Sequence, residues 1–164
     1  MKLSTQEEYG LRCLLQLARH GDSASLTISE MSQREGISAP NVAKILRLLR
    51  RASLLTSTRG KAGGYTLARS ASQITVGEVL AALGGRLWDP AFCERHAGGS
   101  QECANLGECS IRPVLRYVQE AIDHVLAQLS LADLLATETE VVAVVRPRSK
   151  TLPLVGRLRT TRPL

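Results

Sequence analysis

The 164-residue sequence has very few aromatic residues, with one Phe, one Trp and three Tyr. A core built almost without them must rely on Leu, Val, Ile and Ala, which favours helices. The sequence also lacks an apolar run long enough to cross a membrane, and its first residues lack the apolar segment of a signal peptide. We therefore expect a cytoplasmic protein without membrane contact, built as one domain or as a small domain with an oligomerisation arm.

Motifs of the common enzyme classes are missing as well. The sequence has no Cys-x-x-Cys pair, no nucleotide-binding glycine fingerprint and no catalytic triad. A disulfide framework fits poorly, because three of the four cysteines lie close together and would leave one unpaired, and the cytoplasm is reducing. We expect a protein that is not an enzyme and has no small-molecule substrate. A thiol-dependent redox enzyme is the weaker alternative.

Acidic residues are absent between residues 36 and 69, where seven basic residues lie. Residues 1–69 contain eleven basic and five acidic residues, residues 70–145 contain four and ten, and residues 146–164 contain six and none. Basic runs are often only solvated faces. A basic run that coincides with a motif able to enter a DNA groove is a stronger signal for nucleic-acid binding.

Capping signals predict three helices in this N-terminal half, at residues 5–20, 28–34 and 39–52. Ser38 is expected to cap the third helix, and Gly36 lies in the turn before it. The third helix has one apolar stripe and a polar, basic opposite face. A short helix, a glycine-containing turn and a basic second helix form a helix-turn-helix pattern.

A predicted hairpin follows, with strands at residues 54–58 and 65–68. Its Gly-rich loop contains Arg59 and Lys61, which can reach phosphates or a minor groove, as the wing of a winged helix does. Base edges would be read by Asn41 and its neighbours, and phosphates would be held mainly by the arginines and lysines. The predicted DNA-binding residues are Ser38, Ala39, Pro40, Asn41, Lys44, Arg47, Arg51, Arg59, Lys61, Gly63 and Gly64.

The C-terminal half contains a heptad seam. After a capped helix at residues 76–83, the longest periodic segment begins at Ser110 and spaces its apolar residues by three and four. Such a seam can pack within the protomer, but little chain remains to cover it, which favours a two-fold homodimer. The seam residues are Leu115, Val118, Ile122, Val125 and Leu129.

The cysteines Cys93, Cys103 and Cys109 share one Gly-rich segment with the spacing Cys-x9-Cys-x5-Cys. Thiolates are soft ligands, and three on one segment can turn towards a single metal centre. The spacing differs from zinc-ribbon knuckles, although His96 would complete a Cys3His zinc site. Three unrelated free thiols are a weaker alternative, because free cysteines favour buried apolar sites. Cys13, on the apolar face of the first helix, is expected to be a core thiol.

Several short motifs, in one order and frame, carry a family resemblance up to about residue 136. They are Met-Lys-Leu-Ser with Tyr-Gly-Leu-Arg, Ile-Ser-Glu with Gly-Ile-Ser, Arg-Gly-x-x-Gly-Gly-Tyr, Ile-Thr-Val-Gly-Glu-Val, the three cysteines and Leu-Ala-Asp-Leu-Leu. On these motifs the sequence resembles the IscR/NsrR family of bacterial winged-helix regulators that carry iron–sulfur clusters. The resemblance implies a homodimeric transcription regulator whose cluster state sets its affinity for double-stranded DNA.

The fourth cluster ligand is where the sequence departs from this family. The first cysteine gap is longer than is common there, and the position of a histidine ligand found in some members is occupied by Arg112. Other members use an acidic residue of the first helix, supplied by the partner subunit, and Glu8 is at the matching position. The equal alternative for Glu8 is a carboxylate that closes the first capping box. The resemblance gives no support to His96.

The sequence thus predicts a mainly α fold with a small β wing. Residues 1–84 would form a winged helix-turn-helix domain, residues 85–109 a cysteine-rich cluster-binding loop, residues 110–136 a dimerisation helix and a closing helix, and residues 137–164 a disordered basic tail. The expected function is that of a transcriptional repressor controlled by an iron–sulfur cluster, [2Fe-2S] in preference to [4Fe-4S], which senses redox, nitric oxide or iron–sulfur status. A zinc-stabilised or a metal-free thiol-sensing regulator on the same scaffold is the alternative.

Overall fold

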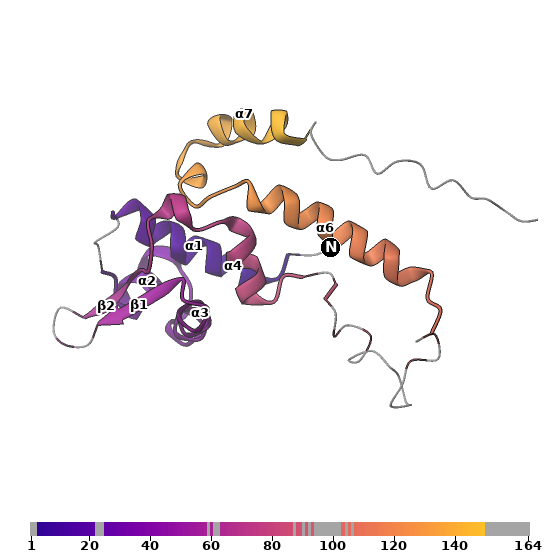
Figure 1. Cartoon of the computed structure of the whole chain (residues 1–164). Coiled ribbons are helices and arrows are strands. Elements are labelled where there is room, and N and C mark those ends of the chain that lie inside the picture. The colour runs from indigo at the N-terminus through magenta and orange to yellow at the C-terminus, as the bar shows by residue number, and fades with distance from the viewer. Residues whose placement is uncertain are drawn as a thin grey trace, which may run out of the picture.

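The fold is mainly helical with one small sheet, as predicted (Figure 1). A computed structural model describes residues 3–21, 25–58, 60, 63–86, 88–89, 91, 93, 103, 105 and 107–149. The elements, with η for a 3-10 helix, are α1 (Thr5–Arg19), α2 (Ile28–Glu35), α3 (Ala39–Arg51), β1 (Leu55–Thr58), β2 (Gly64–Leu67), η1 (Ala71–Gln73), α4 (Val76–Leu83), α6 (Ile111–Ala127), η2 (Asp133–Leu135) and α7 (Glu138–Ser149).

The helices begin and end where short-range chemistry dictates. A capping box opens each of α1, α2 and α4: a Ser or Thr side chain accepts from the backbone N–H of the Glu three residues later, and the Glu carboxylate accepts from the backbone N–H of that Ser or Thr. Gly36 and Gly84 end α2 and α4 in the left-handed conformation, at φ of 64° and 99°. Ser38 is the N-cap residue of α3, as predicted, but its side chain makes no capping hydrogen bond.

The core surrounds α1, which packs against both α3 and α4. Gly10 makes the α1–α4 contact possible, because a Cβ at this position would lie 2.2 Å from Leu83 Cδ1. Among the described residues, the fully buried core side chains include no aromatic ring, in keeping with the composition. They are Leu14, Leu17, Met31, Leu46, Leu49, Leu54, Leu55, Ile74, Leu131, Val42, Val79 and Cys13.

The wing is an antiparallel hairpin in which Leu55 pairs with Leu67 and Thr58 with Gly64. Its second strand is joined, near the loop end of the hairpin, to the chain just before α2. Leu26 N donates to Tyr65 O over 3.0 Å, and Tyr65 N donates to Leu26 O over 2.9 Å. The hairpin is therefore hydrogen-bonded to the helix-turn-helix as well as continuous with it.

Helix α6 extends beyond the body formed by α1 to α4 (Figure 1). Its C-terminal end is anchored there, since Leu129 is buried with Val76 and Leu80, and Val76 N donates to Leu129 O over 2.8 Å. The last residue of the predicted seam is thus part of the protomer's own core. Among the described residues, none of the helices has the length and apolar character that a membrane crossing requires.

Two predictions for the C-terminal region are corrected. The predicted closing helix at residues 130–136 is only the 3-10 turn η2. The predicted disordered tail from residue 137 instead begins with α7, which spans twelve residues. The cause is a fourth capping pair: Thr137 N donates to a Glu140 carboxylate oxygen over 2.8 Å, and Glu140 N donates to Thr137 Oγ1. Residues 150–164 lie outside the described part of the chain.

Candidate DNA-binding surface and cysteine segment

Helix α3 divides its residues between the core and the surface. Val42, Leu46 and Leu49 are completely buried, which fixes the rotation of the helix about its axis. With that rotation, the predicted DNA-binding residues Pro40, Asn41, Lys44, Arg47 and Arg51 are all exposed. A helix held by its apolar stripe thus presents a cationic ridge that can enter a major groove.

A groove of about 330 Å³ separates this ridge from the wing. Three cationic side chains and no acidic one line it, and this single sign of charge suits a phosphate backbone. Arg50 Nη1 also donates to Ser57 Oγ over 3.1 Å, which joins α3 to β1. The lining residues are Pro40, Ala43, Lys44, Arg47, Arg50 and Tyr65.

Arg50 and Tyr65 are functional candidates that the predicted residue set lacks. The helical spacing contained a signal for Arg50, because it follows Arg47 by three residues and so lies on the same side of the helix. Tyr65 is brought to the groove by the hairpin, and no local pattern indicates that placement.

A second groove, of about 210 Å³, lies on the opposite flank of α3, against the first turns of α1. Asn41 is here, beside Gln6 and Tyr9 of α1, so the predicted base reader borders α1 rather than the wing. Lys44 lines both grooves and therefore lies between them.

The remaining predicted DNA contacts divide into three groups. Ser38 and Ala39 are exposed at the start of α3, beside the ridge. Gly64 is half-buried, and a Cβ there would lie 2.9 Å from Leu26 O, so this glycine allows the start of β2 to lie close to the chain before α2. Gly63 is half-buried in the turn, with its N–H donating to Gly60 O over 2.9 Å. Arg59 and Lys61 lie outside the described residues.

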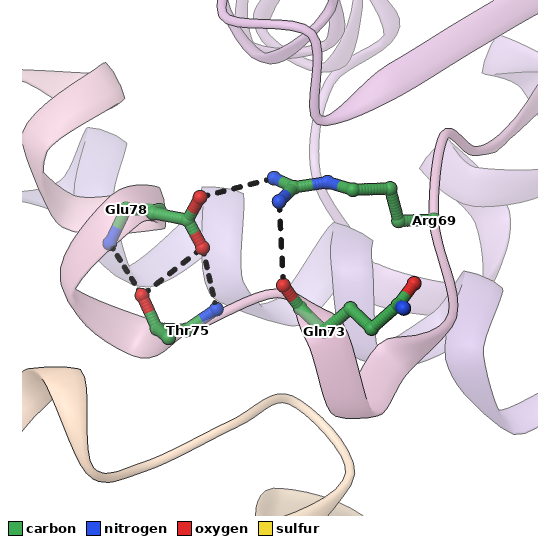
Figure 2. A network of polar contacts seen from close by, with 4 residues as sticks. All are labelled: Arg69, Gln73, Thr75 and Glu78. Carbon is green, nitrogen blue, oxygen red and sulfur yellow. Dashed lines mark hydrogen bonds and ion pairs between the residues drawn. The ribbon is translucent and has the colours of Figure 1, made fainter.

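Arg69 also belongs to the acid-free stretch, but it is paired within the protomer (Figure 2). Its guanidinium donates to Glu78 Oε1 over 3.0 Å and to Gln73 O over 3.4 Å. The hydrogen bond from the backbone N–H of Thr75 is the main cause that lowers the pKa of Glu78 below its ordinary value, and Arg69 adds to it. Arg69 therefore joins the end of the wing to the start of α4.

The cysteines differ sharply in environment. Cys13 is completely buried in the core, and this burial raises the pKa of its thiol to about 12, so it remains a neutral core group as predicted. Cys93, Cys103 and Cys109 are half-buried free thiols between α4 and α6. Among the described residues, no three Cys, His, Asp or Glu side chains converge to a metal-binding group. His96 lies outside the described part of the chain.

Two adjacent carboxylates near the start of α1 have different surroundings. Glu7 closes the capping box, with an oxygen 2.6 Å from Ser4 N, and is almost completely buried. Glu8 is 55% exposed and has only a long contact of 3.5 Å to Arg12. Arg12 in turn donates to the Glu35 carboxylate over 2.7 Å and to Glu35 O over 2.6 Å. The capping-box alternative for Glu8 is thus removed, because Glu7 has that role.

Comparison with known proteins identifies the family of the chain. Residues 3–137 match the Rrf2 family, described as an iron-dependent transcriptional regulator. The protein rrf2 of Nitratidesulfovibrio vulgaris is 37% identical over 135 residues, which cover 82% of this chain and 87% of the relative. The HTH-type transcriptional regulator IscR of Sodalis glossinidius is 30% identical over 145 residues, covering 88% of this chain and 84% of the relative.

A solved structure has the same architecture. CymR, the global cysteine regulator of B. subtilis, is similar with a TM-score of 0.63 and 26% identity, over 82% of this chain and 96% of its own. The resemblance deduced from the sequence motifs and the predicted winged-helix fold are both confirmed. Because the family match runs from the start of α1 to the start of α7, the chain belongs to the Rrf2 family of iron-dependent transcriptional regulators.

Proposed function

We propose that this protein is a homodimeric transcriptional repressor whose affinity for its operator is set by an iron–sulfur cluster held between α4 and α6. The acid-free groove between α3 and the wing is the observation that supports DNA binding most directly. Family membership supports regulation of transcription and dependence on iron.

DNA recognition would use the two flanks of α3 for different purposes. Lys44, Arg47 and Arg50, facing the wing, would hold phosphates and set the register of the protein on the duplex. Asn41, on the other flank, has an amide that can bond bidentately to adenine. Arg51, further along the ridge, would add a phosphate contact.

The dimer would form through the part of α6 that the protomer leaves uncovered. Ile111 is 64% exposed, Val114 60% and Val118 38%. Large apolar side chains on one stretch of helix are costly in water, and a two-fold axis lets one such stripe cover its own copy. Of the predicted seam residues, Val118 would lie in this contact beside Ile111 and Val114, which are outside the seam, while Leu129 belongs to the protomer. Two recognition helices would then enter major grooves about one DNA turn apart, roughly 34 Å.

The cluster would be held by Cys93, Cys103 and Cys109. These thiols are free and only half-buried, and they are soft donors, whereas the neutral core thiol of Cys13 is unsuitable. An iron–sulfur cluster supplies reversible electron transfer and an iron that small oxidants can attack. The segment that carries the thiols joins the winged domain to α6, so its conformation bears on both.

Glu8 of the partner subunit is proposed as the fourth ligand. Its exposure and its weak contact with Arg12 leave the carboxylate available, unlike the capping carboxylate of Glu7. Arg12 would lose part of its pairing with Glu8 in that arrangement and keep its bonds to Glu35 at the end of α2. The acid would thereby adjoin the helix-turn-helix, and coupling of this kind is typically worth ~1–3 kcal/mol.

Anaerobic purification followed by iron and sulfide assays and an absorption spectrum tests the cluster. The proposal expects iron and sulfide with visible absorption, and tighter operator binding in one cluster state than in the other, measured by anisotropy on DNA selected from genomic fragments. Stoichiometric zinc without colour would instead favour the zinc-stabilised regulator. Absence of any metal, with DNA binding that responds to thiol oxidation, would favour the metal-free sensor.

Glu8→Ala tests the fourth ligand, with Glu30→Ala as a matched control in the capping box of α2. Glu8→Ala should alter the cluster spectrum while the apo protein keeps its helicity. Glu30→Ala should weaken α2 and leave the spectrum as in the wild type. An unchanged spectrum in Glu8→Ala would remove Glu8 from the ligand set, and His96→Ala would then identify the other candidate.

A further inference from the structure

Two polar side chains, Glu7 and Gln119, are buried among the described residues. Both lie against the same stretch of chain, residues 84–86 and 88–89, which connects the end of α4 to Cys93 and is called the approach segment below. Buried polar groups are costly unless they are satisfied, and satisfied networks hold their surroundings in one arrangement. Their coincidence on this segment points to a role in its placement.

Gln119 holds the approach segment against α6. Its Oε1 accepts a hydrogen bond from Trp88 N over 3.2 Å, and its Nε2 donates to Asp123 Oδ1 over 2.8 Å. Asp123 is also paired with Arg86, so the two residues on α6 bind the segment at two points. Trp88 packs beside them, with its indole Nε1 buried and without a hydrogen-bond partner among the described residues.

Glu7 holds the other end of the approach segment against α1. A Cβ on Gly85 would lie 2.5 Å from Glu7 Oε1, so the backbone passes directly against the buried carboxylate. The neighbouring Gln6 donates its Nε2 hydrogen to Leu83 O over 2.8 Å. The same first turns of α1, through Gln6, line the groove beside Asn41 on α3.

We propose that Gln119 and Glu7 are positioning residues that fix the approach segment from two sides and thereby set the location of Cys93. As a consequence, the two residues would govern how long the cluster is retained; this consequence rests on the proposed function. Movement of Cys93 would be transmitted to α6 through Gln119 and to α1 through Glu7. The approach segment meets Glu7 of α1 and Gln119 of α6 and leads to Cys93.

The chain's single tryptophan makes this proposal directly measurable, because all tryptophan fluorescence comes from Trp88. Gln119→Leu keeps the side-chain volume and removes both hydrogen bonds. In the full-length apo protein it should shift the emission to longer wavelength and raise acrylamide quenching. Alkylation of Cys93, followed by mass spectrometry, should accelerate about fivefold, the factor expected from losing the hydrogen bond between Gln119 and Trp88, which is the one that reaches the segment.

Matched variants separate positioning from a general loss of structure. Glu120→Gln changes an exposed neighbour whose contact with Arg116 is 3.6 Å long, and should behave as the wild type. Gln119→Glu places a second carboxylate beside Asp123 and should loosen Trp88, whereas adding Asp123→Asn restores one donor and one acceptor and should rescue it in part, because Arg86 then loses its charged partner. Gly85→Ala disturbs the segment from the Glu7 side and should resemble Gln119→Leu.

The reconstituted protein supplies the last measurement. Gln119→Leu should lose its cluster about fivefold faster than the wild type and Glu120→Gln, with circular dichroism showing equal helicity in all three. Wild-type values of Trp88 quenching and Cys93 alkylation in Gln119→Leu would overturn the proposal, and so would an unchanged cluster lifetime when both have risen. A wild type that binds no iron would refute the proposed function alone, because quenching and alkylation need no metal and still decide the positioning role.

Discussion

Replacing Arg47 by Ala should reduce the salt dependence of operator binding. Arg47 lines the groove beside the wing with Lys44 and Arg50, so a dimer would present six such cations to phosphates. Each phosphate that is neutralised contributes about −0.9 to the slope of log K against the logarithm of the salt concentration, so the six cations together contribute roughly −5. Arg47→Ala removes two phosphate contacts per dimer and should make the slope less negative by about 2.

Arg69→Ala is the control, because it removes the same charge from the same acid-free stretch. The structure pairs Arg69 with Glu78 and Gln73 (Figure 2), so its loss should lower the melting temperature and leave the slope unchanged. Fluorescence anisotropy on a labelled operator, between roughly 50 and 200 mM salt, measures both slopes. A wild-type slope in Arg47→Ala would refute the α3 surface, and an equal loss of slope in Arg47→Ala and Arg69→Ala would leave net charge as the determinant.

Three further perturbations test the packing, the dimer and the acid response. Gly10→Ala should destabilise the protein by about 1–2 kcal/mol, since overpacking costs ~1–3 and the better helix propensity returns ~0.5–1. Leu83→Ala should relieve the clash in a double-mutant cycle by thermal denaturation, and strictly additive effects would contradict it. Val114→Glu should convert the dimer to a monomer in sedimentation velocity, and a monomeric wild type would remove the proposed interface. Stability should fall as the pH drops below about 4.5, because the backbone N–H of Thr75 holds the pKa of Glu78 below that ordinary value and the unfolded chain takes up the proton first. Glu78→Gln should flatten this acid limb in urea titrations, and an identical limb would show that other carboxylates govern it.

The helical part of the fold was predictable because its signals are local. A Ser or Thr followed three residues later by Glu marks the start of α1, α2 and α4, and each such pair forms the expected reciprocal bonds. The same motif at Thr137 and Glu140 opens α7, but the basic, proline-containing chain after it suggested disorder. The local signal was the better guide, because a capping pair acts within one turn whatever composition follows.

The site was predictable only where helical periodicity decides exposure. The ridge on α3 followed from its apolar stripe, whereas the pairing of Arg69 with Glu78 depends on the hairpin returning the chain to α4. Charge counting includes Arg69 in the acid-free stretch, because sequence alone does not show which cations already have partners. The spacing of the three cysteines is similarly silent on Gln119, a residue thirty-one positions from Trp88 that meets it through tertiary packing.

The two hydrogen bonds between Leu26 and Tyr65 affect how such a regulator can be controlled. They hold the wing against the start of α2, while Arg50 joins α3 to β1, so the described residues of the helix-turn-helix and the wing are bonded into one unit, called the winged unit below. A signal from the cysteine segment would then leave each winged unit intact and change the separation or rotation between the two winged units of a dimer. Inserting one base pair between the half-sites of an operator should therefore reverse or abolish the protein's preference for binding in one cluster state, because it changes the distance and rotation between the half-sites.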